Sequence, residues 1–193
     1  GTNGSTVGGG IKENNFLGKG ISLNTNLQLS SDGIKGRFIY SKPNFNYTDN
    51  TLFTSIRSDS VDNMSGFGYK TDNVGFSIGT GYEQYENLFF KPEIDVSFEN
   101  LQTDKKASSA LKKQAGNYED LYFNYSLDYD LRNKRYKPTD GYIATFRQQL
   151  PLVSNSYELT NTFTYSKYKM LVSKMVGRFS IYASSVTALS DNN

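Results

Sequence analysis

The sequence predicts an all-β protein, and within that class an antiparallel, up-and-down transmembrane β-barrel. Residues 120–131 read DLYFNYSLDYDL, in which apolar and polar side chains alternate without a break. A β-strand places such residues on opposite faces, so this segment has one apolar and one wet face. The pattern recurs along nearly the whole chain. Aromatic residues, all Tyr or Phe, make up 15% of the sequence and concentrate on the apolar faces, as in membrane barrels.

Each strand is expected to end where turn-forming residues interrupt the alternation. SSDG at residues 30–33 is a tight hairpin signal, and NNFLGKG, KPNFNYTDN, EQYEN and PLVSNS are further turns. Longer polar loops are expected at 59–68 and 102–117, and SSALKKQ in the second has the composition for one helical turn. About ten strands lie between these connections, at residues 6–12, 21–29, 34–41, 52–58, 73–82, 90–99, 120–131, 142–150, 157–168 and 176–189.

The two faces of these strands differ in a consistent way. In 73–82, Val, Phe, Ile and Tyr occupy one face and Gly and Ser the other. In 90–99, charged residues alternate with apolar ones, and in 176–189 Phe179, Ile181 and Ala183 point outward. Several strands approach the 9–11 residues that a tilted strand needs to cross a bilayer. Ten strands would form either an incomplete barrel or a strongly curved open sheet.

Composition excludes several classes of function. The net charge is +2 and the charges are scattered, so no basic stripe for nucleic acid is present. The chain has no Cys, which removes disulfides and thiolate metal sites, and no His, the commonest general base and metal ligand. It opens on GTNGSTVGGG without Met or an apolar leader. We therefore expect either a removed signal peptide or a piece of a longer protein, with no cofactor, metal or catalytic residue.

A soluble sandwich or lipocalin-like barrel also produces alternation. Three features favour the membrane barrel. The strands are long, compact connections alternate with longer ones, and Lys91, Glu93 and Asp95 put charges in mid-strand, which suits a watery lumen. Aromatic residues also gather toward strand ends, as interface girdles do; they are Tyr82, Phe89, Phe90, Tyr122, Tyr142, Tyr157 and Tyr168.

Three turns resemble those of the BamA family of the bacterial surface antigen superfamily. KENNFLGKG resembles the turn after the family's second barrel strand, YSKPNFNY its aromatic Pro-containing turn, and YDLRNKRYKPTDG the turn after its eighth strand. The matching residues are Asn15, Phe16, Leu17, Gly18 and Gly20; Pro43; and Asp130, Arg132, Asn133, Pro138, Thr139 and Gly141.

The turns also have a direct physical reading. Gly18 and Gly20 can adopt positive φ in a tight reversal. Pro138 fixes φ, and Gly141 permits a sharp exit into the next strand. Arg132 can clamp a carboxylate or loop carbonyl groups with its planar guanidinium. These residues are therefore expected to shape turns rather than to perform chemistry.

The resemblance implies a single partial barrel domain over residues 1–193, equivalent to strands two to eleven of a sixteen-stranded barrel. Members of the family fold and insert β-barrel proteins in the Gram-negative outer membrane, by lateral opening of the barrel seam and strand templating, without a cofactor. The implied partners are outer-membrane lipid, unfolded β-barrel clients and accessory assembly lipoproteins, and not nucleic acid.

The sequence departs from the family pattern in three respects. It contains no periplasmic repeat domain, the seam strand is missing if residues 6–12 form the second strand, and the lumenal Arg-Gly-Phe motif is absent. Gly36-Arg37-Phe38 and Gly177-Arg178-Phe179 have the wrong order and lie in predicted strands. We therefore expect that the segment does not function alone.

Other functions remain as alternatives. A passive porin or a polypeptide-secretion barrel would share the strand pattern, and a soluble β-sandwich would dissolve without detergent. An outer-membrane enzyme would depend on carboxylate pairs such as Asp128 with Asp130, or Glu93 with Asp95. For the barrel, Tyr125 is expected to face lipid and Ser126 the lumen, so that Arg is tolerated only at Ser126.

Overall fold

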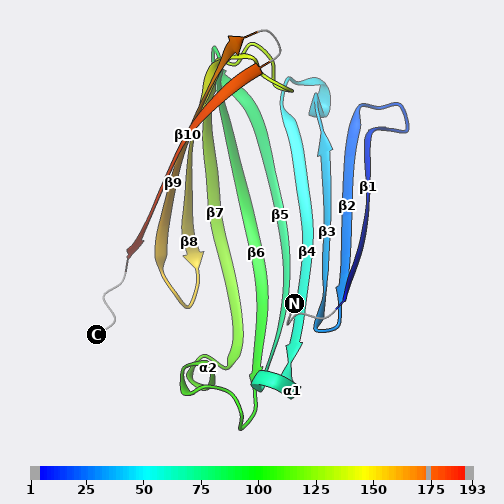
Figure 1. Cartoon of the computed structure of the whole chain (residues 1–193), viewed down its shortest axis with the longest axis vertical. Helices are drawn as coiled ribbons and strands as arrows, with labels where there is room; N and C mark the ends of the chain where they lie inside the picture. The colour runs from blue at the N-terminus through cyan, green and yellow to red at the C-terminus, as the bar shows by residue number, and fades with distance from the viewer. Residues whose placement is uncertain (1–4, 173–174, 190–193) are drawn as a thin grey trace.

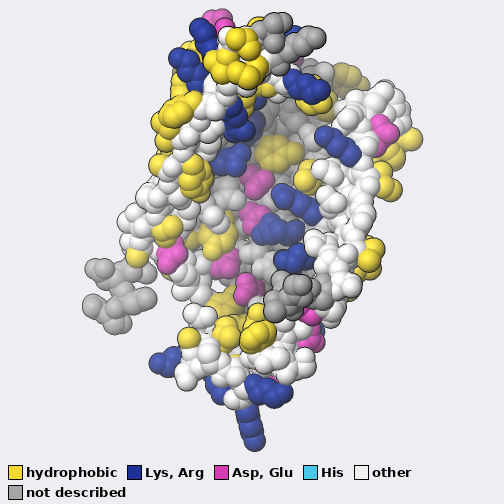
Figure 2. All heavy atoms as spheres, viewed as in Figure 1, with side chains coloured by type: hydrophobic (Ala, Val, Ile, Leu, Met, Phe, Trp, Pro, Cys, Tyr) yellow, Lys and Arg dark blue, Asp and Glu magenta, His cyan; other side chains and the backbone are white. Residues whose placement is uncertain are grey.

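The computed structural model describes residues 5–172 and 175–189, and its strands form one antiparallel sheet that curls around a hollow (Figures 1 and 2). The ten strands follow one another in chain order across the sheet, which confirms the predicted up-and-down topology. Among the described residues, β1 pairs only with β2 and β10 only with β9, so the sheet is open and has two edges.

The strands differ considerably in length. Their bounds are β1 Thr6–Phe16, β2 Ile21–Ser30, β3 Gly33–Lys42, β4 Thr51–Asn63, β5 Tyr69–Tyr85, β6 Leu88–Thr103, β7 Gly116–Asp130, β8 Asp140–Val153, β9 Glu158–Val172 and β10 Met175–Ala188. Three short helical segments lie in the connections: η1 Phe45–Tyr47, α1 Met64–Phe67 and α2 Ser109–Lys113. The helical turn expected after residue 107 is confirmed by α2, where Ser108 accepts a hydrogen bond from the Leu111 amide at 3.2 Å.

Several strands extend into segments that the sequence predicts as loops. Residues 59–63 belong to β4 rather than to a loop, and their backbone pairs in register with residues 69–73 of β5. Both faces are polar here, so alternation disappears although the ladder continues. Residues 14–16 likewise belong to β1, 102–103 to β6, 116–117 to β7 and 169–172 to β9. The rest of the turn predicted at 169–174 lies outside the described residues.

Burial in the sheet is inverted relative to a soluble protein. Among the described residues, the buried hydrophobic side chains are only Ile21, Leu101 and Ala107, whereas Asp95, Asp128 and several serines are buried. Large apolar side chains are exposed instead, for example Phe76 at 44% and Phe179 at 61%. Soluble domains bury such residues and expose charges, so this arrangement favours a membrane wall over a soluble sandwich. No helix among the described residues is long and apolar enough to span a membrane.

Aromatic rings form a ladder on the outward face. Ring centroids lie 5.8 Å apart for Tyr82 and Phe90, 6.1 Å for Tyr129 and Tyr142, and 5.6 Å for Tyr142 and Tyr165.

Three of the aromatic residues compared with an interface girdle, Phe89, Tyr122 and Tyr168, lie on the inward face instead of the outward one. Phe89 lies across from buried Asp128 and Tyr122 across from buried Asp95, so both share the inward face. Tyr168 lies beneath the inward-facing Arg178 guanidinium, 5.7 Å from its ring centroid. Phe89 and Tyr168 are near strand ends as expected, whereas Tyr122 lies in the middle of β7, which begins at Gly116. The phase of each strand decides which face these residues occupy.

Candidate functional site

The concave face is lined by charged side chains of both signs, visible inside the hollow in Figure 2. Its central feature is a bidentate ion pair between β4 and β6. The guanidinium of Arg57 donates to the two carboxylate oxygens of Asp95 at 2.6 and 2.7 Å. Because β5 lies between these strands, the arginine side chain must cross it, and it does so over Gly75. A Cβ on Gly75 would lie 2.3 Å from Arg57 Cζ.

Other small residues of β5 also leave space for larger side chains of the adjacent strands β4 and β6. Ser77 hydrogen-bonds Ser55 of β4 at 2.8 Å. A Cβ at Gly79 would lie 2.5 Å from the Phe53 ring, and a Cβ at Gly81 would lie 3.2 Å from Lys91 Cγ. The Gly/Ser face that the alternation predicts for this strand is thus the concave face, and it seats the side chains of β4 and β6.

A second ion pair joins β6 to β7. Lys91 Nζ donates to Asp128 Oδ2 at 2.5 Å. The other carboxylate oxygen, Oδ1, is buried and accepts no hydrogen bond from the described residues. Asn124 Nδ2 lies 3.4 Å from Glu93 Oε1 on the same face. The carboxylates Asp95 and Asp128 are therefore each engaged by a basic side chain, not poised beside a second free carboxylate.

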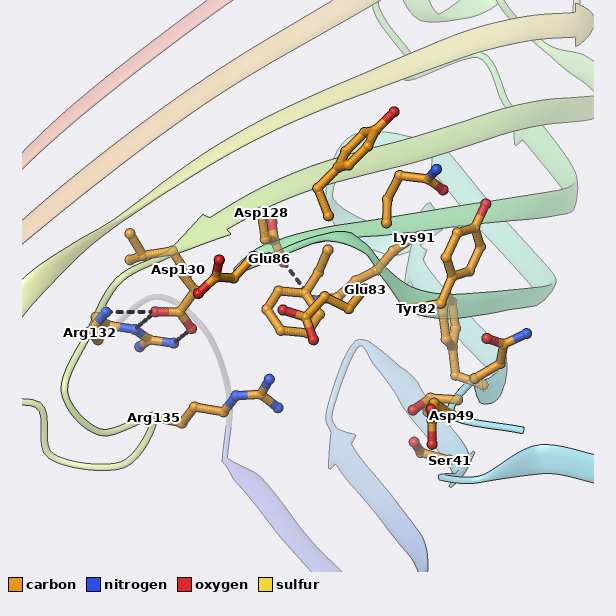
Figure 3. Close-up of a pocket in the computed structure, with 18 of the residues that line it drawn as sticks. Ser41, Asp49, Tyr82, Glu83, Glu86, Lys91, Asp128, Asp130, Arg132 and Arg135 are labelled. Atoms are coloured by element: carbon orange, nitrogen blue, oxygen red, sulfur yellow. Dashed lines mark hydrogen bonds and ion pairs between the residues drawn. The ribbon is translucent and has the colours of Figure 1, made fainter. Parts of the chain in front are cut away.

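A recess of about 1220 Å³ opens on the concave face next to the β7–β8 turn (Figure 3). The Arg135 guanidinium lies 4.9 Å from the Phe89 ring centroid at its wall. Asp49 of the β3–β4 connection, Glu83 near the end of β5 and Glu86 of the β5–β6 connection contribute carboxylates. Within the described residues, no cluster of acidic side chains has the arrangement of a metal site. The recess is a polar, mixed-charge water-accessible space.

The β7–β8 turn is organised by the predicted residues Asp130 and Arg132. Arg132 donates from Nε and Nη2 to the two carboxylate oxygens of Asp130 at 2.8 and 2.7 Å, and its amide donates to the same carboxylate at 3.2 Å. This hydrogen-bonded carboxylate raises the pKa of Arg132, against the opposing effect of partial burial. The expected pairing of Arg132 with a carboxylate is therefore observed, and the carboxylate is that of Asp130 in the same turn.

The remaining predicted residues of this turn close its loop. Asn133 donates from Nδ2 to Thr139 Oγ1 at 2.7 Å and accepts from the Thr139 amide at 3.0 Å. Gly141 has φ of +91°, and a Cβ there would lie 2.1 Å from the carbonyl oxygen of Leu131. Pro138 follows Lys137, which itself has a positive φ of 48°.

The β1–β2 turn has the tight geometry expected of it. Gly18 and Gly20 both have φ of +67°, and Leu17, which has a side chain, also has a positive φ of 57°. Asn15 accepts a hydrogen bond from the Gly20 amide through its side chain at 2.7 Å, across the end of β1 that Phe16 completes. A Cβ at Gly20 would lie 3.9 Å from Pro43, so this turn adjoins the β3–β4 turn.

The motif residues therefore form two groups at the same end of the sheet (Figure 1). The ion pairs of the concave face were not singled out from the sequence as interacting residues. The available signal was alternation with charges in mid-strand, which identifies the face of Arg57, Lys91, Asp95 and Asp128 but not which of them meet.

Comparisons with known proteins agree with this architecture. The family described as "Omp85 superfamily domain" matches residues 15–190. No curated protein sequence matches the chain. Among solved structures, the chain resembles BamA from Haemophilus ducreyi lacking POTRA domains 1–3, with a TM-score of 0.67 and 20% sequence identity. The similarity covers 94% of this chain but only 38% of that one, so the chain spans well under half the length of that relative.

Proposed function

The chain belongs to the Omp85 superfamily, and on that premise we propose that it forms part of the wall of an outer-membrane assembly factor that folds and inserts β-barrel proteins. The family match over residues 15–190 is the observation that carries this proposal. The inverted burial supports the membrane location, because exposed apolar side chains on the outward face need lipid around them.

In this proposal the ten strands are equivalent to strands two to eleven of a sixteen-stranded barrel. The concave face lines the lumen, and the seam lies between strands that this segment does not include. Lateral opening of that seam would expose a strand edge on which an unfolded client pairs by backbone hydrogen bonds. Accessory assembly lipoproteins and a Gram-negative outer membrane complete the proposed setting.

The engagement of the concave carboxylates supports a role without covalent chemistry. Asp95, Asp128 and Asp130 each accept from a basic side chain at 2.5–2.8 Å. A general acid or base must be free to contact a reacting group, and carboxylates held in ion pairs are poorly suited to that task.

The test reconstitutes the barrel that contains this segment into liposomes and adds a urea-unfolded outer-membrane barrel as client. Folding is followed by heat-modifiability on gels, with empty liposomes and liposomes holding an unrelated barrel as controls. Faster client folding than in both controls is expected. A client-independent conductance without accelerated folding would instead indicate a passive porin, and passage of the client into the vesicle interior would indicate a secretion barrel.

Asp128→Asn provides a matched variant for the enzyme alternative. We expect client folding to persist, because the proposed activity uses no proton transfer at this residue. A hydrolytic turnover of added peptide or lipid substrates that disappears in Asp128→Asn would contradict the proposal.

A further inference from the structure

One corner of the sheet is strongly basic. It lies at the end where the β7–β8 turn and the tips of β9 and β10 meet, the upper end in Figure 1. Its described basic residues are Arg132, Lys134, Arg135, Lys137, Lys167, Lys169 and Arg178, and its acidic residues are Asp130 and Asp140, with Glu83 and Glu86 in the adjoining recess. Positive charge therefore exceeds negative charge there, although the whole chain is nearly neutral at +2.

The arginines of this corner are already engaged on the concave side. Arg132 is paired with Asp130, Arg135 lies over Phe89, and Arg178 lies over Tyr168 while donating to Ser180 at 2.9 Å. The lysines differ. Lys134, Lys137, Lys167 and Lys169 are exposed, and within residues 5–172 and 175–189 none of them takes part in an ion pair.

Lys167 and Lys169 stand on the outward face, directly beyond the aromatic ladder. Along β9 the outward positions read Phe163, Tyr165, Lys167, Lys169 and Leu171. Lys167 lies across from Tyr142 on β8, whose ring is 5.6 Å from that of Tyr165. The two lysines thus stand between the aromatic ladder and the exposed Leu171 at the strand end.

The β7–β8 turn adds an aromatic and a cationic side chain at the same end. Tyr136 is 78% exposed, and Lys137 Nζ lies 5.3 Å from its ring centroid. Tyr and Lys side chains with apolar bodies and polar tips are suited to the headgroup region, where one end is dry and the other wet.

We propose that this corner, formed by the β7–β8 turn and the outward end of β9, binds anionic lipid headgroups through the net negative charge of their phosphate. Ammonium groups attract phosphate, and each basic residue near an anionic membrane surface strengthens binding. A lipid fits better than a soluble acidic partner because the lysines continue the apolar outward strip of β9. Lys169 lies across from Asp140, so Lys167 contributes more of the attraction. The inference depends on the membrane location of the wall, but not on client insertion.

The experiment uses the full-length protein that contains this segment, folded in detergent and mixed with phosphatidylglycerol or phosphatidylcholine. Native mass spectrometry counts retained lipid in the parent, in Lys167→Gln/Lys169→Gln and in the control Lys105→Gln/Lys113→Gln. The control removes two exposed lysines near α2, at the opposite end of the sheet. Gel heat-modifiability verifies that all three proteins are folded.

We expect the parent and the control to prefer phosphatidylglycerol, and the Lys167→Gln/Lys169→Gln variant to lose affinity by about fivefold through Lys167, with a smaller further loss through Lys169, which lies across from Asp140. Equal retention of phosphatidylglycerol by both variants would overturn the proposal, as would a parent protein without preference between the lipids. Client folding in phosphatidylcholine liposomes is measured in parallel. Accelerated client folding there, together with either result that overturns the lipid proposal, would leave the proposed insertase function standing.

Discussion

Arg57 and Asp95 belong to strands that are not neighbours, yet their side chains form a bidentate ion pair over Gly75 of the strand between them. Arg57 also lies directly across from Arg37 of β3. Like charges in that position repel. The ion pair with Asp95 holds the Arg57 guanidinium away from that of Arg37. The pair thus links three adjacent strands on the face that carries the lumenal charges.

The first prediction concerns Gly75→Ala. The added Cβ would meet the Arg57 guanidinium at 2.3 Å, and this flexible side chain would move away and lose its two hydrogen bonds to Asp95. Hydrogen bonds to charged groups contribute about 1.5–3 kcal/mol, and partial exposure of Arg57 places the expected loss near the lower end. Urea unfolding in detergent micelles, followed by circular dichroism, measures the free energy of unfolding.

Two comparisons make this prediction specific. In an Arg57→Gln background, Gly75→Ala should have little further effect, because the pair is already lost. Gly9→Ala is the matched control, since nothing lies within 4 Å of a Cβ at that strand position. An equal loss of stability from Gly75→Ala in both backgrounds would show that the alanine acts by general crowding and not through the ion pair.

Gly141→Ala is expected to be far more damaging. The residue has φ of +91°, which L side chains rarely adopt, and its Cβ would collide with backbone rather than with a mobile side chain, 2.1 Å from the Leu131 carbonyl oxygen. Backbone strain of this kind costs about 1–3 kcal/mol, and the clash adds to it. Refolding yield into detergent, read by heat-modifiability, should fall strongly.

Gly66→Ala serves as its control, because Gly66 lies in α1 with open space around its Cβ position. That substitution should leave the yield unchanged or raise it slightly, since alanine favours helix. Comparable yields for the two alanine variants would mean that the β7–β8 turn tolerates another backbone conformation.

The sequence was sufficient for the topology and for the face assigned to most strands, because alternation reports the phase of each strand directly. It placed Gly75 on the small-residue face and Asp95 on the charged face, and both lie on the concave side. It was insufficient where both faces are polar, as at residues 59–63, because there the backbone ladder continues without a side-chain signal.

The concave ion pairs show a second limit. Arg57 and Asp95 are 38 positions apart, and their contact depends on the register of two hairpins and on the absence of a side chain at Gly75. The alternation of apolar and polar residues specifies neither the register of the hairpins nor which side chains fit over Gly75. The ion pair of the β7–β8 turn is predictable from the sequence, by contrast, because Asp130 and Arg132 are two residues apart and meet within one turn.

Tyr125→Arg tests the outward face of β7. Tyr125 contacts Phe90 and Phe146, with ring centroids 5.8 and 6.2 Å away, which places it in the apolar outward strip. An arginine in the middle of a bilayer costs about 2–4 kcal/mol in membrane barrels, so folding into lipid vesicles should be blocked or strongly reduced. Protease protection after refolding measures the outcome.

The control that alternation suggested, Ser126→Arg, is unsuitable. Ser126 is only 9% exposed and lies between Lys91 and Arg147 in the register, so an arginine there would be crowded and repelled. Asn124→Arg is the better choice, because Asn124 lies beside Glu93 at the edge of a recess of about 460 Å³. Equal folding of the variants at residues 125 and 124 would contradict the lipid-facing assignment.

The last prediction concerns a polar pair within the apolar outward face. Gln148 accepts a hydrogen bond from the Tyr125 hydroxyl at 3.0 Å and donates to Asn161 Oδ1 at 2.6 Å. In lipid, removing one partner leaves the other without water to replace it, and such bonds contribute about 0.6–1.7 kcal/mol in membrane proteins. Gln148→Leu and Asn161→Leu should each destabilise the barrel in vesicles.

The double variant Gln148→Leu/Asn161→Leu should then be no less stable than Gln148→Leu alone, because it removes the Asn161 amide that the single variant leaves unpaired, while the Tyr125 hydroxyl lacks its acceptor in both. Gln149→Leu/Thr160→Leu changes the neighbouring pair on the concave face, where water is available, and should show no such recovery. Urea titration of refolded vesicle samples gives the free energies of unfolding of the parent, of both double variants and of their four single variants. Additive losses in the outward double variant would place Gln148 and Asn161 in contact with water rather than lipid.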